Sequence, residues 1–154
     1  QKAIESGYDP EIILAGRKMN DSMGGYVATE TVKMMINKGA TIKGSRALVL
    51  GITFKENCPD IRNSRVIDII EEFQSYHVDV DVYDPWASKD EVKHEYGINL
   101  ISDVDNLGTD YDAVILAVSH NEFLKLDITK LKSQTGVIFD VKSLLRRDTV
   151  DARL

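Results

Sequence analysis

Short apolar segments and longer amphipathic segments alternate along the chain from residue 46 onward. Branched apolar residues in segments of about five to seven residues predict strands. The stronger candidates are residues 46–50, 79–83, 112–118 and 136–140, and residues 99–101 are expected to form a further short strand. Apolar residues at helical spacing predict helices between them, namely from near Asn63 and over residues 88–96, 120–125 and 128–133. This alternation predicts an α/β fold, a Rossmann-like doubly wound parallel sheet with helices on both faces.

One long helical segment precedes the alternating unit. Asp9 and Pro10 suit the start of a helix, and Gly39 suits its end. The pair Gly24-Gly25 in its middle predicts either a kink or close packing against another helix. We place the domain boundary between residues 39 and 45, which gives a helical region at 1–42 and an α/β domain at 43–154, and we expect the polar residues 146–154 to fray.

Composition and charge narrow the functional classes. The chain has 154 residues, 43% hydrophobic and 29% charged, which is typical of a soluble globular protein. It has no apolar run of the roughly 20 residues that a membrane span needs, and its net charge of −6 argues against general nucleic-acid binding. A single cysteine excludes an intrachain disulfide and a multi-cysteine zinc site, and it fits a reducing cytoplasm.

The N-terminus adds a further expectation. The chain begins with Gln1 and has neither an initiator Met nor the apolar core of a signal peptide. We therefore expect it to be a piece of a longer protein.

The loop after the first strand carries the strongest candidate chemistry. Gly51 suits a sharp exit from the strand, and about ten residues follow before the next helix, which is long for a connection in a compact domain. Lys55 and Arg62 supply two cations beside the amide of Asn57. Since ligands of open α/β sheets bind where strands end, we expect an anion here. The alternative is a solvated loop with two ordinary surface cations.

A third cation follows the last predicted strand. Lys142 lies at the same edge of the sheet in a parallel topology, so Lys55, Arg62 and Lys142 are expected to converge on one anion, and a nucleotide diphosphate would suit them. The first strand ends in Gly51-Ile52-Thr53-Phe54, which is not the Gly-x-Gly-x-x-Gly fingerprint. We therefore do not expect the domain to hold a dinucleotide in the standard way.

Several other residues have two interpretations each. Asp84 lies where a ribose-binding acid would stand, but without the fingerprint glycines we favour a turn formed with Pro85. Cys58 is either a nucleophile or, as we favour, an unreactive thiol. His120 is either a general base or a cap of the following helix, and stays unassigned. Trp86 either stacks on a base or pins the loop, and we favour pinning.

Two acids, Asp60 and Asp140, are expected to brace their loops, because each has backbone amides and a basic residue nearby in sequence. No group of residues suggests metal ligands.

Three motifs together resemble a known family. They are Gly-Ile-Thr-Phe-Lys-Glu-Asn-Cys-Pro-Asp-Ile-Arg-Asn-Ser at 51–64, Val-Tyr-Asp-Pro at 82–85 and Phe-Asp-Val-Lys at 139–142. The chain is similar to the C-terminal part of the UDP-glucose/GDP-mannose dehydrogenase family, and the similarity includes residues 16–21 of the long helix. The Asn-Cys-Pro-Asp segment resembles the bacterial branch that acts on UDP-N-acetylhexosamines for capsule or surface polysaccharide.

The resemblance implies a function for the longer protein. Members carry out an NAD-dependent, two-step oxidation of a sugar C6 hydroxyl to a carboxylate, as cytoplasmic homodimers joined through a central helical region. An N-terminal Rossmann domain holds NAD, and the C-terminal domain closes over the UDP-sugar. By this resemblance Phe54 and Lys55 contact the substrate, Lys142 contacts the UDP moiety, and Arg62 reaches towards NAD. The substrate is then UDP-N-acetylhexosamine or UDP-glucose.

One family feature is missing. The nucleophilic cysteine of the family lies upstream in a Gly-Gly-x-Cys segment that this sequence lacks, and Cys58 belongs to a different motif. We therefore expect no catalytic residue in this chain and no turnover by it alone. The alternative function is a non-catalytic doubly wound nucleotide-binding or dimerisation module. A phospho-accepting receiver is disfavoured because Gly51-Ile52-Thr53 replaces the acidic pair that it needs.

Overall fold

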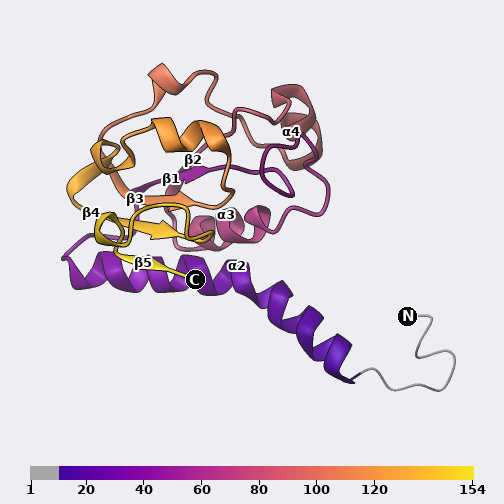
Figure 1. Ribbon diagram of the computed structural model, residues 1–154. Coiled ribbons are helices and arrows are strands. Elements are labelled where there is room, and N and C mark those ends of the chain that lie inside the picture. Colours follow the sequence, from indigo (N-terminus) through magenta and orange to yellow (C-terminus); the bar gives the residue numbers. More distant parts are fainter. Residues whose placement is uncertain (1–10) are drawn as a thin grey trace, which may run out of the picture.

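A five-stranded parallel sheet forms the centre of the molecule (Figure 1). The computed structural model describes residues 11–154, and their side chains except those of 11–14, 17, 19 and 20. The strand order is β2-β1-β3-β4-β5. The strands are β1 (Arg46–Leu50), β2 (Asp79–Tyr83), β3 (Tyr111–Leu116), β4 (Lys132–Asp140) and β5 (Ala152–Arg153). The α-helices are α2 (Glu11–Asn37), α3 (Val66–Ser75) and α4 (Lys89–Tyr96), and the 3₁₀ helices are η1 (Val104–Asn106), η2 (Asn121–Lys125), η3 (Ile128–Lys130) and η4 (Arg147–Thr149).

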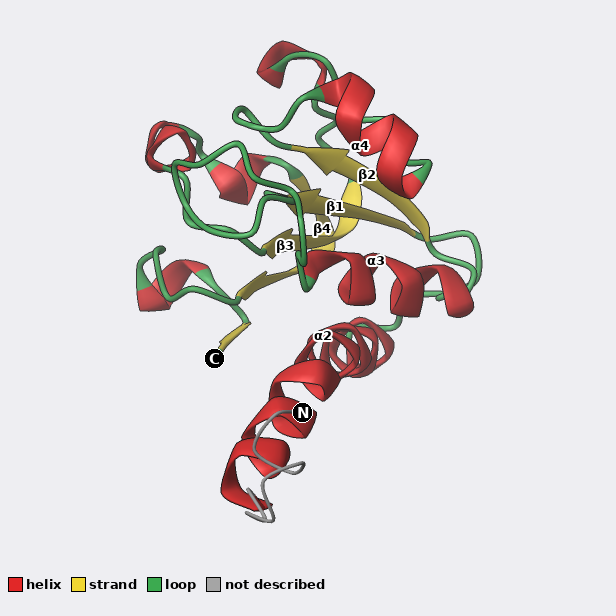
Figure 2. Ribbon diagram, turned by 90° about the vertical axis from the view of Figure 1, so that its right-hand side faces the viewer, coloured by secondary structure: helices red, strands yellow, loops and turns green. Residues whose placement is uncertain are grey.

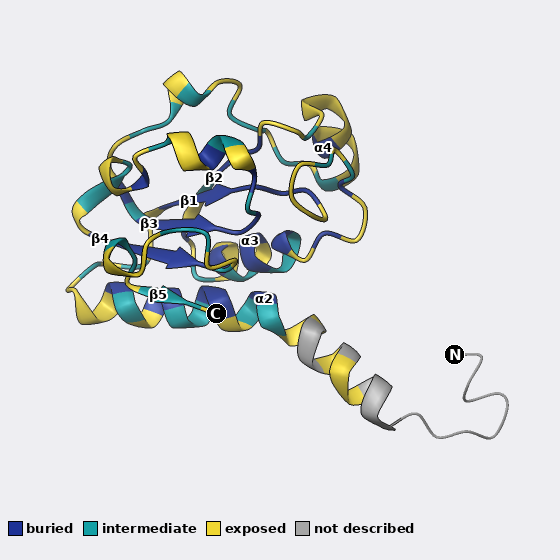
Figure 3. Cartoon of the chain, in the orientation of Figure 1, coloured by how far each residue is buried: buried dark blue, intermediate teal, exposed yellow. Residues whose placement is uncertain are grey.

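The alternation along each strand divides the core between the two faces of the sheet. Ala47 and Val49 of β1 pack with the helices α2 and α3, whereas Leu48 and Leu50 pack with Phe123 of η2 and its neighbours. Figure 2 shows α2 and α3 beneath the strands, and Figure 3 shows the strands buried between the two layers. The predicted α/β class with a parallel sheet is confirmed, but 3₁₀ helices and loops cover the second face.

Helix α2 packs closely against α3 through Gly24. A Cβ atom at Gly24 would lie 2.5 Å from the Cβ of Asp68, whereas a Cβ at Gly25 would meet nothing within 4 Å. Close packing, one of the two outcomes predicted for this pair, is thus confirmed. Asp9 and Pro10 lie outside the described residues. No helix in the described part of the chain is both long and apolar enough to cross a membrane.

The C-terminal segment is ordered by pairing, so the prediction that residues 146–154 fray is wrong. β5 extends the sheet, with Ala152 opposite Phe139 and Arg153 opposite Asp140. The carboxylate of Asp151 accepts a hydrogen bond from the amide of Ile138 at 2.8 Å. A free edge of β4 therefore orders a segment whose polar sequence gives no strand signal.

Smaller differences concern element ends. The strand predicted at 112–118 ends at Leu116, and the one predicted at 136–140 begins at Lys132 with a register irregularity opposite Tyr111. The strand predicted at 99–101 is a single parallel bridge between Leu100 and Val82. The two predicted helices after β3 are short 3₁₀ helices.

Candidate functional site

The chain leaves β1 through a turn that requires glycine. Gly51 has a φ of +91°, and a Cβ there would lie 2.5 Å from the Cβ of Val118. Its amide donates to the carbonyl of Tyr83 at 2.8 Å, so the turn is also tied to β2. The sharp exit predicted at Gly51 is confirmed, and the following loop begins at the carboxyl edge of the sheet.

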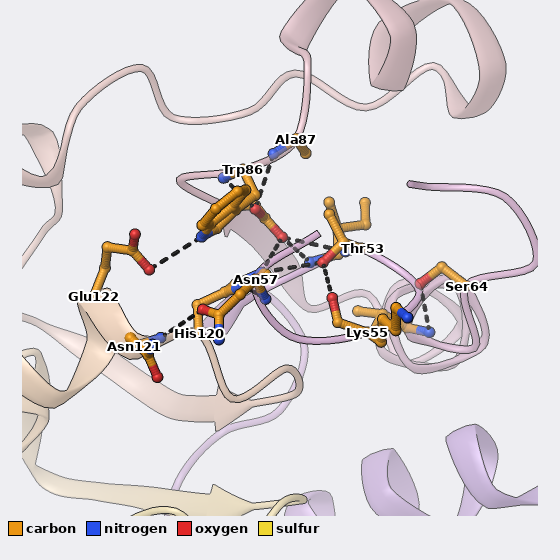
Figure 4. Close-up of polar contacts among 12 residues, drawn as sticks. Thr53, Lys55, Asn57, Ser64, Trp86, Ala87, His120, Asn121 and Glu122 are labelled. Carbon is orange, nitrogen blue, oxygen red and sulfur yellow. Dashed lines mark hydrogen bonds and ion pairs between the residues drawn. The ribbon is translucent and has the colours of Figure 1, made fainter. Parts of the chain in front are cut away.

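Asp84 holds two turns together at this edge. Its Oδ2 accepts from the amides of Ile52 at 2.7 Å and Thr53 at 3.2 Å, and its Oδ1 accepts from those of Trp86 at 2.7 Å and Ala87 at 3.0 Å (Figure 4). The interpretation of Asp84 as a turn residue is confirmed. Because protein donors occupy both oxygens, this carboxylate does not serve a ribose hydroxyl as the corresponding acid of a Rossmann domain does.

These hydrogen bonds also set the charge of Asp84. Burial by itself raises the pKa of a carboxyl, but the hydrogen bonds from His120 and from the amide of Ile52 outweigh it, so the pKa of Asp84 lies below its usual value. Asp84 is therefore a buried carboxylate at neutral pH, stabilised by its donors.

His120 is a fully buried brace between three segments. Its Nδ1 accepts from the amide of Asn57 at 2.9 Å, and its Nε2 lies 3.0 Å from Oδ2 of Asp84 and 3.1 Å from Oγ1 of Thr53. Since Nδ1 is an acceptor, the ring is neutral with its hydrogen on Nε2. The helix-cap interpretation is wrong, because the side chain makes no capping hydrogen bond to η2. Its buried position between protein partners gives the general-base interpretation no support.

Trp86 covers this cluster from outside. Its ring stacks on that of His120 with centroids 6.4 Å apart, and its Nε1 donates to Oε2 of Glu122 at 3.1 Å. The prediction that Trp86 pins the loop is confirmed.

A cavity of about 610 Å³ lies next to this cluster, between α2, the start of α3 and the ends of β3 and β4. Phe54 and Lys142 both line it, and the Phe54 side chain is exposed. Its other lining residues come from several separate segments, namely Asp21, Met23, Gly24, Val27, Thr53, Asn63, Ser64, Arg65, Val66, Ile69, Ala117, Val118, Val141 and Leu154. The structure thus brings together residues from distant parts of the chain around a space of ligand size.

Lys142 is positioned by a buried acid. Asp140, fully buried at the end of β4, accepts from the amide of Lys142 at 3.1 Å through Oδ1 and from that of Leu145 at 2.7 Å through Oδ2. The expected loop-bracing role of Asp140 is confirmed, and it fixes the backbone that presents Lys142 to the cavity.

The second cation in the cavity wall is one that the sequence analysis missed. Arg65 pairs with Asp21 of α2, and its Nη1 lies 3.5 Å from Oδ2 of Asp68. The spacing of Arg65 and Asp68 was a weak sequence signal of a helical ion pair. The contact with α2 depends on the tertiary structure, because 44 residues separate Arg65 from Asp21.

The other two predicted cations lie elsewhere. Lys55 is exposed and is not among the cavity-lining residues, although its carbonyl accepts from Thr53 Oγ1 at 3.0 Å. Arg62 lines a separate hollow of about 650 Å³ beside acidic residues of α4. Of the three cations expected to converge, Lys142 alone lines the 610 Å³ cavity.

Arg62 and Asp60 form a local pair. The Arg62 side chain donates to both oxygens of Asp60, at 2.9 and 2.8 Å, and its amide donates at 3.0 Å. These hydrogen bonds from Arg62 lower the pKa of Asp60 to about 2. The predicted bracing role of Asp60 is confirmed, and the Arg62 side chain remains 82% exposed.

Within the described part of the chain, the residues at this edge of the sheet do not form a nicotinamide-dinucleotide site of the usual kind. Backbone amides donate hydrogen bonds to both carboxylate oxygens of Asp84, and the loop after β1 lacks the fingerprint glycines. Cys58 is a partly exposed free thiol. Within the described residues, no group of three or more His, Cys, Asp or Glu side chains is placed to hold a metal ion.

Comparison with known proteins shows the family to which this arrangement is similar. Residues 48–147 match the model of the UDP-glucose/GDP-mannose dehydrogenase family, UDP binding domain. The chain is 47% identical to UDP-N-acetyl-D-glucosamine 6-dehydrogenase of Pseudomonas aeruginosa, over 99% of this chain and 36% of that protein. It is 42% identical to Protein CapL of Staphylococcus aureus, over 97% of this chain and 35% of that protein.

A solved structure agrees with the fold. The structure of UDP-D-ManNAc dehydrogenase from Pyrococcus horikoshii superposes with a TM-score of 0.80 at 19% identity, covering 98% of this chain and 35% of that one. The chain therefore spans about a third of the length of the relatives that it matches.

Proposed function

The chain belongs to the UDP-glucose/GDP-mannose dehydrogenase family, and we propose that its cavity between Phe54 and Lys142 binds the nucleotide of a UDP-sugar. The observation that carries this proposal is the convergence, on one 610 Å³ cavity at the carboxyl edge of the sheet, of an exposed aromatic ring and a braced lysine. Arg65 adds a second cation to the same wall. Ligands of open α/β sheets bind at this edge.

The chemistry of the wall suits a nucleoside diphosphate. The ammonium group of Lys142 and the guanidinium of Arg65 complement phosphate charge. The N-terminal turn of α3 borders the cavity at Ser64 and Val66, where the helix dipole favours an anion. The ring of Phe54 offers a flat apolar surface to a base or sugar. In this proposal Lys55, which follows Phe54 in the same loop, contacts the sugar or its phosphates from the rim of the cavity.

We further propose that the chain is part of an NAD-dependent UDP-sugar 6-dehydrogenase. Two relatives are named UDP-N-acetyl-D-glucosamine 6-dehydrogenase, at 47% and 48% identity, which favours a UDP-N-acetylhexosamine over UDP-glucose. NAD would be held by a part of the longer protein that this chain does not include, and the exposed guanidinium of Arg62 would face it across a domain boundary. This chain alone would then produce no NADH.

The long helix fits the same scheme. We propose that residues 1–42 belong to a central helical region through which a homodimer forms, and that residues 43–154 are the UDP-sugar-binding domain. Exposed apolar side chains on α2, Tyr26 and Ile36, support a contact with another chain.

Calorimetric titration with UDP tests the proposal. We expect the unmodified chain to bind UDP weakly and the Lys142→Ala and Lys55→Ala variants to bind roughly tenfold more weakly, because each loses a charge-assisted contact. The matched control is Lys130→Ala, which removes an exposed lysine paired with Asp127 and distant from the cavity lining. Equal affinity of all four proteins, or no binding by any of them, would contradict the proposal and favour a dimerisation module.

A further inference from the structure

We propose that His120 is a positioning residue for the bound ligand, acting through the amide of Asn57 on the loop that carries Phe54 and Lys55. The inference rests on the proposed function, because it concerns the same cavity. The hydrogen bonds of the His120 side chain go to Thr53, Asn57 and Asp84, and none goes to the side chains of Phe54 or Lys55. The role of His120 follows from the hydrogen bonds that hold the loop (Figure 4).

The hydrogen bonds of Thr53 and His120 define which atoms donate and which accept. The single hydroxyl hydrogen of Thr53 goes to the carbonyl of Lys55 at 3.0 Å, so its oxygen accepts from Nε2 of His120. Nε2 also points at Oδ2 of Asp84, and Nδ1 is left as the acceptor for the Asn57 amide. The loop therefore depends on a histidine that both donates and accepts, with neither function replaceable by the other nitrogen.

Burial of the ring makes the acceptor at Nδ1 difficult to replace with water. The side chains of His120 and Asp84 are both 0% exposed, so solvent has no access to the ring when a partner is lost. Asn57 has a left-handed φ of +52°, a conformation that the backbone does not favour unaided. Without its acceptor on His120, the amide of Asn57 loses the bond that offsets this conformation.

The brace ties the 53–57 loop to the segment that follows β3, whereas Lys142 is held by a different acid. Lys142 is fixed by Asp140 at the end of β4, whereas the 53–57 loop is fixed by Asp84 after β2 and by His120 after β3. A second bond, from the amide of Asn121 to Oδ1 of Asn57 at 3.1 Å, joins the same two segments. His120 thus fixes the loop of Phe54 at the end of β3, and β3 pairs with β4, whose end presents Lys142. Phe54 and Lys142 are the two groups that flank the proposed ligand.

Two substitutions separate the two nitrogens. In His120→Asn, the side-chain oxygen lies near the position of Nδ1 and keeps an acceptor for the Asn57 amide. In His120→Gln, the longer side chain places its NH₂ near the position of Nε2 and keeps the donor to Asp84, but leaves the Asn57 amide without its acceptor. Both remove the imidazole, so both lose the stacking with Trp86. The matched control is His94→Gln, which changes an exposed histidine of α4.

The experiment measures the affinity for UDP-N-acetylglucosamine by calorimetry and the hydrogen exchange of residues 53–57 without ligand. We expect His120→Gln to bind roughly tenfold more weakly and to lose exchange protection in the loop, because the amide of Asn57 has lost its acceptor. We expect His120→Asn to restore both to within about threefold of the unmodified chain, and His94→Gln to change neither.

The outcomes separate this inference from the proposed function. If the two His120 variants lose affinity and protection equally, His120 only fills space and the inference is wrong. If His120→Gln keeps the protection of the loop, the inference is wrong whether or not ligand binds. If the unmodified chain binds neither UDP nor UDP-N-acetylglucosamine, the proposed function fails, and any change in exchange would then describe a structural brace without a ligand-positioning role.

Discussion

The two halves of the loop between β1 and α3 differ in the charged contacts that they make. Residues 51–57 are tied to buried groups from other strands, Asp84 after β2 and His120 after β3. Residues 58–65 include an exposed pair, Asp60 with Arg62, whose partners are two residues apart in sequence. The first half carries Phe54 and Lys55, and the second half carries Arg62.

The difference shows where the loop can be rigid. Charge-assisted bonds between a buried carboxylate and backbone amides contribute strongly, because the groups cannot return to water while the protein is folded. An exposed ion pair is screened and contributes little. We infer that the first half is fixed in the free protein, whereas the Arg62 side chain is available to change partners when another surface approaches.

The largest effect is expected when the buried charge of Asp84 is removed. Asp84→Asn replaces an oxygen acceptor with an NH₂ group that faces backbone amides, and we expect it to destabilise the fold by about 3 kcal/mol. Urea unfolding followed by circular dichroism measures the loss. The control Asp90→Asn makes the same change of charge on the exposed face of α4 and should have little effect. Equal losses for the two variants would remove the distinction between buried and exposed acids.

The exit from β1 provides the next test. Gly51→Ala forces a side chain into the left-handed region and against Val118, so we expect a loss of about 2 kcal/mol or more. Gly25→Ala is the matched control, since its added Cβ meets nothing within 4 Å and a helical alanine is favoured by roughly 0.5–1 kcal/mol. A Gly51→Ala variant as stable as its control would mean that the first half of the loop is not rigid.

Acid should reduce the stability that Asp84 gives to residues 51–57, over a defined range of pH. The folded-state pKa of Asp84 lies below its unfolded value, so its stabilising contribution is complete above the unfolded pKa near 4 and is lost as the pH falls through the folded pKa. We expect the free energy of unfolding to fall as the pH is lowered from about 5 to 3. The decrease in the free energy of unfolding per pH unit should be smaller in Asp84→Asn, which has no carboxyl to protonate at this position. An unchanged slope in that variant would assign the acid sensitivity to other groups.

The smallest effect is expected in the exposed half. Arg62→Ala removes the pair with Asp60, and we expect Tm to change by less than about 2 °C because the pair is exposed. A differential scanning calorimetry trace of this variant beside Asp84→Asn compares the two halves directly. A large loss in Arg62→Ala would show that Arg62 has a structural role in the isolated chain.

Local sequence determined most of the framework. The strands at 46–50 and 79–83 appear with the predicted bounds, and Ser88 and Gly97 cap α4 as their residue types favour. The three motifs also identified the family, which the match over residues 48–147 confirms. Such features depend on side-chain periodicity, on the conformational freedom of glycine and on capping, all of which act within a few residues of the chain.

Tertiary structure decided the rest. β5 forms because β4 offers a free edge, Arg65 enters the cavity wall because α2 packs against α3, and His120 becomes a brace because the ends of three strands meet. Each of these contacts joins residues far apart in sequence, and the amino-acid types alone fit several roles equally well. The sequence by itself therefore determined strands β1 to β4 of the sheet and the loop that carries the candidate residues Phe54 and Lys55. Only the packing of distant segments decided which cations share a cavity and which polar side chains are buried, because burial and distance are properties of the folded chain.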